Sequence, residues 1–132
     1  MKHITTIKHK GFEWHIIDKP TKKRVDWLAK NFRFATQDLN DCAPPLQRPK
    51  TVERDDYLFV ILFFPFYNRE KREIESAKIN FFVEKNRLII IHENNLHPII
   101  DLQQECQRDE LARQVFMGDG SKLLYELLNR LL

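Results

Sequence analysis

Carboxylates are the side chains in this sequence with the clearest capacity for chemistry. Asp38 and Asp41 are three residues apart in a segment that is predicted to be a short helix, so both are expected on one helix face. Hard divalent cations such as Mg²⁺ bind through one or two carboxylates and retain several waters. The spacing therefore makes Asp38 and Asp41 candidate ligands of a weak, water-mediated metal site. The alternative is that these acids, and the adjacent pair Asp55-Asp56, do no more than solvate the surface.

The histidines do not form the common zinc-protease motif. HExxH places two histidines at i and i+4 on one helix face, whereas the segment HENNLH has His92 and His97 with Leu96 between them. The remaining histidines alternate with apolar residues near the N-terminus and are predicted to be surface residues: His3, His9 and His15.

Other compositional features exclude further classes of protein. Cys42 and Cys106 form no CxxC pattern and have no neighbouring histidine as a base, which favours a reducing cytosol and no thiol catalysis. The 22 basic and 19 acidic residues are mixed along the chain, so the net charge of +3 is not a nucleic-acid footprint. The three glycines form no phosphate-binding loop. The sequence therefore predicts neither an enzyme nor a nucleic-acid-binding protein.

The most apolar segment, YLFVILFFPFY at residues 57–67, is too short to cross a membrane. As a helix it would rise about 16 Å, roughly half of the ~30 Å hydrocarbon layer. A continuous run of aromatic and β-branched residues is typical of a strand that is buried on both faces. Pro65 cannot donate a backbone hydrogen bond, so it is predicted to mark the place where pairing stops or a bulge begins.

Four further strands are predicted, over residues 3–9, 12–18, 76–84 and 87–92. The first two form a hairpin at Gly11, and the loop before the third is the charged segment 68–73. Alternation predicts one buried face in two strands: Phe12, Trp14 and Ile16 in the second, and Ile79, Phe81 and Val83 in the third.

Helical patterns lie on either side of these strands. Pro20 and Thr21 open a helix whose predicted apolar stripe is Val25, Leu28, Ala29 and Phe32. Thr36 is the predicted N-cap of a short helix that ends at Ala43-Pro44-Pro45. A helical pattern from Leu96 is broken at residues 118–120, and a last helix begins at Ser121. The predicted fold is one α/β domain over residues 1–132, a mixed parallel and antiparallel sheet with helices on both faces.

The central segment DLNDCAPPLQRPKTVERDDYLFVILFFPFYN places these elements in a known order. Leu39-Asn40-Asp41, Gln47-Arg48-Pro49-Lys50 and Asp55-Asp56 precede the aromatic-aliphatic strand. This order resembles the N-terminal cytosolic domain of the CorA-like family of magnesium and cobalt channels. The resemblance continues through KNRLIIIHE and GSKLLYELLNRLL, and covers about residues 30–132.

The resemblance implies the regulatory, funnel-lining domain of a homopentameric channel for Mg²⁺ and Co²⁺, on the cytoplasmic side of the cell membrane. The stalk and transmembrane helices would lie beyond residue 132, and the isolated domain is expected to be a monomer or a weak oligomer. Family members sense Mg²⁺ with carboxylates at subunit interfaces, and Asp41 matches the Asp of the family's Leu-Glu-Asp sequence. Asn40 replaces the preceding Glu, so a second sensor site does not carry over.

Two alternatives share the same predicted fold. One is a free-standing soluble binding module, which would show in the gene as a stop codon soon after Leu132. The other is the corresponding domain of a zinc-transporting relative. The reading frame after Leu132 distinguishes a channel from a free-standing module. A channel needs two spans of about 20 apolar residues, and in this family Gly-Met-Asn lies between them.

Overall fold

The computed structural model describes residues 3–43, 48–93 and 96–132. Its elements, in chain order, are β1 (Ile4–His9), β2 (Phe12–Asp18), α1 (Lys22–Asn31), α2 (Thr36–Asp41), β3 (Lys50–Glu53), β4 (Leu58–Asn68), β5 (Glu73–Glu84), β6 (Arg87–His92), α3 (His97–Arg108), α4 (Glu110–Phe116) and α5 (Gly120–Leu131).

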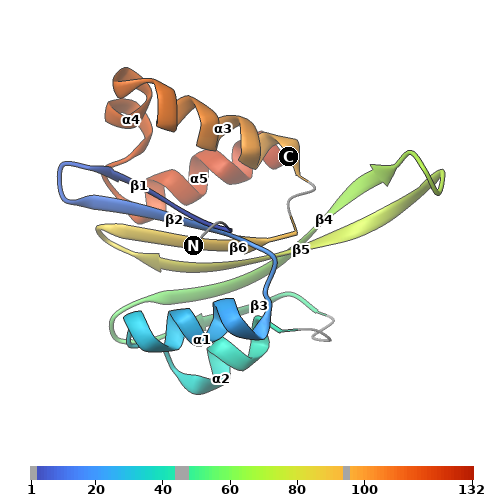
Figure 1. The fold of residues 1–132 in the computed structure, drawn as a ribbon, viewed down its shortest axis with the longest axis horizontal. Coiled ribbons are helices and arrows are strands. Elements are labelled where there is room, and N and C mark those ends of the chain that lie inside the picture. The colour runs from blue at the N-terminus through green and yellow to red at the C-terminus, as the bar shows by residue number, and fades with distance from the viewer. Residues whose placement is uncertain (1–2, 44–47, 94–95) are drawn as a thin grey trace.

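The described strands form one six-stranded sheet in the order β1-β2-β6-β5-β4-β3. β2 and β6 run parallel, and the other neighbours are antiparallel, so the sheet is mixed. In Figure 1, α3, α4 and α5 lie on one face of the sheet and α1 and α2 on the other. The predicted α/β architecture with helices on both faces is confirmed.

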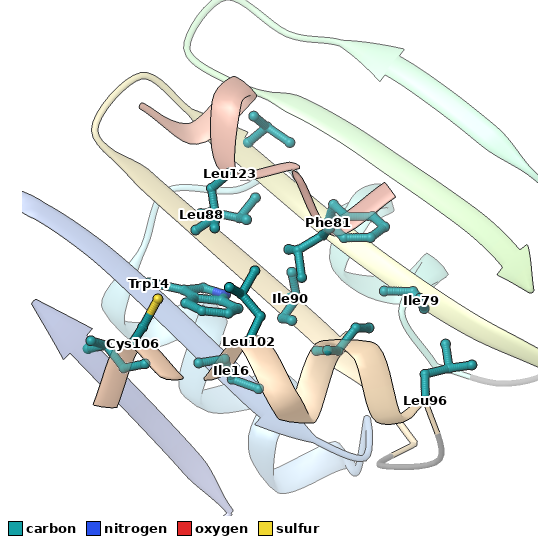
Figure 2. Close-up of a cluster of buried hydrophobic side chains, with 14 of the residues drawn as sticks. Trp14, Ile16, Ile79, Phe81, Leu88, Ile90, Leu96, Leu102, Cys106 and Leu123 are labelled. Atoms are coloured by element: carbon teal, nitrogen blue, oxygen red, sulfur yellow. The ribbon is translucent and has the colours of Figure 1, made fainter. Parts of the chain in front are cut away.

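The first hairpin has the predicted strands and turn. Lys10 and Gly11 both have positive φ angles, 46° and 82°, the backbone conformation of a tight hairpin turn. On β2, alternate side chains point to opposite layers, and those of Phe12, Trp14 and Ile16 join the core beneath α3 and α5. Figure 2 shows Trp14 and Ile16 in this cluster with side chains from β5, β6 and the C-terminal helices.

The strand β4 contributes to both cores, as the apolar run predicts. Phe59 and Ile61 pack toward α1 and α2, whereas Val60 and Phe64 pack toward the C-terminal helices. The prediction for Pro65 is wrong, because it pairs with Ser76 in unbroken register and β4 continues to Asn68. β3 flanks β4 only as far as Ile61. The outer side of β4 is an open edge beyond that point, and an edge accommodates a residue without an N–H.

The N-terminal helices differ in detail from their sequence patterns. Thr21 caps α1, and Leu28 is buried, but Ala29 is exposed. Trp27 is half-buried instead, and its ring packs against Phe32 at a centroid distance of 5.6 Å.

The N-cap of α2 is Ala35 and not Thr36. Ala35 makes no side-chain cap bond, and its own N–H donates to the Tyr57 hydroxyl at 2.8 Å. α2 ends at Asp41, and the predicted stop at Pro44-Pro45 lies outside the described residues.

The C-terminal helical region is divided at two aspartates. Asp109 caps α4 by accepting from Leu111 N–H, and Asp119 caps α5 by accepting from Ser121 and Lys122 N–H. The second break is the predicted one at residues 118–120. Among the described residues, no helix is both long and apolar enough to cross a lipid bilayer.

Candidate functional site

The two aspartates of α2 lie at the junction of this helix with β3 and the turn that follows it. Asp38 is fully buried, and its carboxylate accepts two hydrogen bonds from Arg54, Nε to Oδ2 at 3.0 Å and Nη2 to Oδ1 at 2.8 Å. The Tyr57 hydroxyl donates to Oδ2 at 2.6 Å. Three donors therefore satisfy both oxygens of a buried carboxylate, as burial of a charge requires.

These contacts set the protonation state of Asp38. Burial alone would raise the pKa of the Asp38 carboxyl, but the hydrogen bonds from Arg54 and Tyr57 and the Arg54 charge together hold it below its ordinary value. Burial and the Asp38 hydrogen bond raise the pKa of Tyr57, so its hydroxyl stays a donor. Asp38 is thus an ionised anchor between α2 and the β3–β4 turn.

Asp41, one turn further along α2, has a different partner. The Lys50 ammonium lies 2.5 Å from Asp41 Oδ2, and this pair is largely but not completely shielded from solvent. The Lys78 ammonium donates to the Asp41 backbone carbonyl at 2.7 Å, and burial lowers the pKa of Lys78. Two lysines from β3 and β5 therefore hold the end of α2 against the sheet.

Both predicted ligands already have protein partners in the described chain. The oxygens of Asp38 are taken by Arg54 and Tyr57, while Asp41 is paired with an ammonium. Across residues 3–43, 48–93 and 96–132, no three His, Cys, Asp or Glu side chains are placed to hold one metal ion. A divalent cation at Asp41 would have to displace Lys50, and waters or further oxygen ligands would have to complete its coordination shell. Asp55 and Asp56 are exposed on the β3–β4 turn.

The thiols are not nucleophiles in this fold. Burial raises the pKa of Cys42 to about 12 and that of Cys106 to about 11. The Cys42 Sγ lies 3.4 Å from the Asp38 carbonyl oxygen, within the layer between α2 and the sheet. Both side chains pack as small apolar groups.

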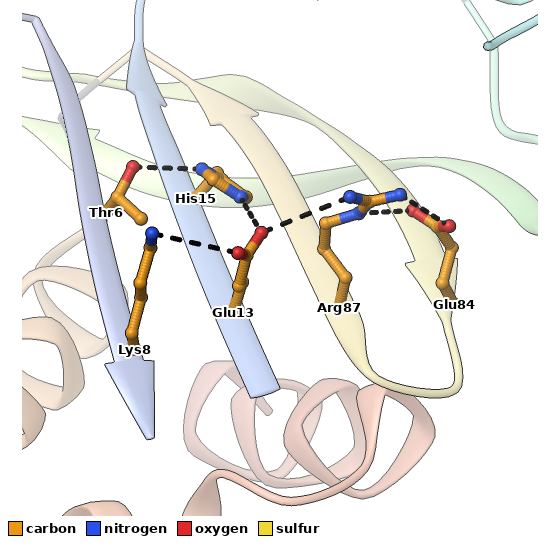
Figure 3. A network of polar contacts seen from close by, with 6 residues as sticks. All are labelled: Thr6, Lys8, Glu13, His15, Glu84 and Arg87. Atoms are coloured by element: carbon orange, nitrogen blue, oxygen red, sulfur yellow. Dashed lines mark hydrogen bonds and ion pairs between the residues drawn. The ribbon is translucent and has the colours of Figure 1, made fainter. Parts of the chain in front are cut away.

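A second polar cluster, drawn in Figure 3, crosses the sheet under α1 and corrects one prediction. His15 is only 6% exposed, not a surface residue. Its Nδ1 lies 2.9 Å from the Thr6 hydroxyl and its Nε2 2.9 Å from Glu13 Oε1. The alternation of β2 turns His15 toward α1, where Trp27 and Phe32 cover it.

Arg87 and Glu84 continue this cluster toward the β5–β6 turn. The Arg87 guanidinium binds Glu84 at 2.7 and 2.8 Å, lies 4.0 Å from Glu13, and stands over the Phe32 ring at 4.5 Å. Burial lowers the pKa of His15 in spite of its bond to Glu13. The spacing of Glu84 and Arg87 across a turn is visible in the sequence, but their meeting with β2 depends on the parallel pairing of β2 and β6.

The two histidines of the HENNLH segment lie in different environments. His92 ends β6 and is 2% exposed, whereas His97 is exposed at the first turn of α3. The partners that sequence reasoning missed are Arg54, Lys50 and Lys78. Arg54 and Lys50 precede β4 within the resembling segment, but only the fold shows that they face α2.

The open mixed sheet between two helical layers is a fold that solved structures share. The chain superposes on the soluble domain of CorA from Methanocaldococcus jannaschii with a TM-score of 0.74, at 21% identity over 92% of this chain and 47% of that one. The superposition on the full-length CmaX protein has a TM-score of 0.74, at 16% identity, and covers 91% of this chain and 36% of that chain. The superposition on the ZntB cytoplasmic domain from Vibrio parahaemolyticus has a TM-score of 0.70, at 16% identity, and covers 93% of this chain and 48% of that chain.

The sequence itself shows the family. Residues 9–132 match the family model described as CorA-like Mg²⁺ transporter protein, so the chain belongs to that family. This is a family of transporters and not of enzymes, as the sequence predicts. Among curated proteins, no relative matches the chain. The chain spans less than half the length of each of the three matched structures.

Proposed function

We propose that the chain is the regulatory cytosolic domain of a CorA-like divalent cation channel, which takes part in Mg²⁺ sensing and in gating the uptake of Mg²⁺ and Co²⁺. The observation that carries this proposal is the family match over residues 9–132, which includes both helical layers and five of the six described strands in full. The share of each matched chain that is covered leaves room for a stalk and membrane spans in the complete protein. In this proposal the domain lies on the cytoplasmic side of the membrane, in a homopentamer.

Asp41 is the proposed contribution of this chain to cation sensing. Its side chain is partly accessible to solvent, and its present partner is a lysine, a flexible cation that another cation can replace. Asp38 is locked by Arg54, which makes it the support of the helix rather than the exchangeable ligand. Neutralised carboxylates between subunits would favour a closely packed ring, and loss of the cation would favour its loosening.

The uptake of Mg²⁺, Co²⁺ and Zn²⁺ into cells that produce the whole protein encoded by this reading frame tests the function. We expect Mg²⁺ and Co²⁺ to enter, and uptake to fall as internal Mg²⁺ rises. A protein that restores no divalent cation uptake would overturn the proposal. A reading frame without membrane spans would instead identify a free-standing binding module, and transport of Zn²⁺ alone would identify the zinc-transporting relative.

The role of Asp41 is tested in the same cells with Asp41→Asn. We expect a several-fold higher internal Mg²⁺ concentration for half-inhibition of uptake. The matched control is Asp101→Asn, which removes one exposed carboxylate from α3. If the two variants need the same internal Mg²⁺ concentration for half-inhibition of uptake, Asp41 has no role in sensing, and the proposed transport function is unaffected.

A further inference from the structure

Two lysines reach the end of α2 from two different strands, Lys50 from β3 and Lys78 from β5. Lys50 pairs with Ile61 of β4, and Ile61 pairs in turn with Asn80 of β5. Residues that are directly opposite each other across strands have their side chains on one face of the sheet. Lys78 shares that face, because it is two residues from Asn80 on the same strand. Both lysines therefore lie on the face that α2 covers, where Ile61 packs.

The two lysines bind different atoms of Asp41. The Lys50 ammonium lies 2.5 Å from the carboxylate oxygen Oδ2, whereas the Lys78 ammonium donates to the backbone carbonyl at 2.7 Å. The Lys78 contact thus leaves the carboxylate oxygens of Asp41 untouched. Of these two lysines, it is Lys50 that competes with any other cation for the Asp41 side chain.

The ion pair of Asp41 and Lys50 is shielded from water but is not sealed. The two side chains are 18% and 29% exposed, respectively. Partial burial strengthens the attraction between the charges, because the effective dielectric constant there is lower than in water. The exposure that remains gives a cation from solution access to the carboxylate. Asp38, by contrast, is fully buried and is held by Arg54, so the pair at Asp41 is the exchangeable one of the two.

Asp41 fits a hard divalent cation as one carboxylate ligand, with waters in the rest of the coordination shell. One carboxylate does not hold this cation and the Lys50 ammonium together, because two positive charges a few ångströms apart repel each other. Asp41 is thus competent for binding only in the fraction of molecules in which Lys50 has left it. The apparent affinity falls by that fraction, so a pair formed in about nine-tenths of the molecules weakens binding about tenfold.

We propose that Lys50 is an internal competitor for the cation that Asp41 senses. The Lys50 ammonium occupies the carboxylate while the free cation concentration is low, and the strength of the ion pair sets the concentration at which it is displaced. This inference rests on the proposed sensing role of Asp41 and adds the group that regulates its affinity. Lys50 acts through Asp41, so it is a positioning residue and not a ligand.

Paramagnetic broadening by Mn²⁺ tests the competition on this chain alone. Mn²⁺ prefers oxygen ligands, as Mg²⁺ does, and it broadens the amide NMR signals of residues close to it. We expect the amide signal of residue 41 in Lys50→Met to broaden at a several-fold lower Mn²⁺ concentration than in the parent chain. Methionine keeps an unbranched apolar stem but supplies neither a positive charge nor an oxygen ligand. The same Mn²⁺ concentration for both chains would overturn the proposal.

Two control chains separate competition at Asp41 from a general change of charge. Lys71→Met removes a lysine from another ion pair, the one with Glu75, and should leave the Mn²⁺ response of residue 41 as it is in the parent chain. Asp41→Asn combined with Lys50→Met should abolish the gain in affinity. A gain that appears in Lys71→Met, or that persists without the Asp41 carboxylate, would show that Lys50 does not compete for Asp41.

Lys50→Arg provides a second measurement, which holds even if Lys50→Met does not fold. A guanidinium stays charged and has the geometry to bind both oxygens of a carboxylate, so arginine is a competitor at least as strong as lysine. We expect this variant to need as much Mn²⁺ as the parent chain, or more, and tighter binding would contradict the competition. A lysine that merely supported α2 would weaken Mn²⁺ binding when replaced by methionine, which is the opposite of the expected change.

Uptake in cells with the whole protein distinguishes this inference from the proposed function. Lys50→Met should lower the internal Mg²⁺ concentration for half-inhibition several-fold, whereas Asp41→Asn should raise it. If Lys50→Met strengthens Mn²⁺ binding but neither variant changes the inhibition of uptake, the competition stands and the sensing role fails. If Asp41→Asn raises the half-inhibition concentration but Lys50→Met changes neither Mn²⁺ binding nor inhibition, the sensing role stands and the competition fails.

Discussion

Arg54 binds both carboxylate oxygens of Asp38, at 2.8 and 3.0 Å, and so joins α2 to the turn that precedes β4. The carboxylate is completely buried, while the guanidinium is partly exposed. A paired Arg–carboxylate geometry fixes orientation as well as charge, because two parallel bonds prevent rotation. This anchor holds the helix that presents Asp41.

Tyr57→Phe removes one hydroxyl that serves two partners. The variant loses the donor to Asp38 Oδ2 and the acceptor of the Ala35 N–H. We expect the free energy of unfolding to fall by about 1–3 kcal/mol, the range for leaving a buried polar group without its partner. Urea denaturation measures the change. Tyr125→Phe is the matched control, since Tyr125 is 67% exposed, and equal stability of the two variants would contradict the role of the hydroxyl.

Acidification should destabilise the fold through His92. Burial lowers the pKa of His92 to about 4, although the Asp18 charge acts in the opposite direction. The unfolded chain binds a proton at the ordinary pKa of about 6.5, so the contribution of neutral His92 is complete above that value and is lost as the pH falls. From pH 7 to pH 5, the loss is about 2 kcal/mol at 1.36 kcal/mol per pKa unit.

His92→Asn tests this dependence by urea denaturation at both pH values. We expect the variant to lose less stability on acidification than the parent chain. The control His97→Asn changes an exposed histidine and should keep the parent's pH dependence. If His92→Asn loses as much stability between pH 7 and pH 5 as the parent chain, another group controls the acid sensitivity.

Gly120 and Gly118 provide a matched pair for testing how α5 docks. A Cβ atom at Gly120 would lie 1.9 Å from the Glu84 carbonyl oxygen and 3.0 Å from that of Arg87, whereas none of the surrounding atoms is within 4 Å at Gly118. Gly120→Ala should therefore force α5 away from the β5–β6 turn, at a cost of about 1–3 kcal/mol. Gly118→Ala should change stability little. Thermal unfolding compares them, and equal melting temperatures would refute the close approach.

Both thiols should be unreactive in the native protein. Cys42 and Cys106 are fully buried, and burial raises the pKa of each, to about 12 and about 11. We expect no reaction with a disulfide reagent at mildly alkaline pH until denaturant is added, when both thiols react. Rapid modification of the folded chain would show that the α2 or α3 layer opens readily.

The local pattern of apolar and polar residues was sufficient to predict most of the fold. Alternation placed Phe12, Trp14 and Ile16 on one face of β2, and the apolar run of residues 57–67 predicted a strand buried on both faces. Such patterns are reliable because a strand has a period of two and the buried side must be apolar. The order of segments around Asp41 also sufficed for the family.

Three features depended on neighbours distant in sequence. Pro65 stays in the ladder because β3 is too short to flank it. His15 is buried because β1 and α1 cover it, so a polar residue in an alternating strand did not mean a solvent-facing one. Ala35 and not Thr36 is the N-cap of α2, and its N–H donates to Tyr57, 22 residues further along the chain.

The sequence by itself determined the fold class, the strand faces and the family, since these follow from periodicity and from the order of short segments. Only the tertiary structure decided what the two carboxylates of α2 do. Spacing makes Asp38 and Asp41 equivalent, but the sheet presents Arg54 and Tyr57 to the first and Lys50 to the second. The physical reason is that the free energy of a charge depends on burial and on partners, and both are supplied by strands from elsewhere in the chain.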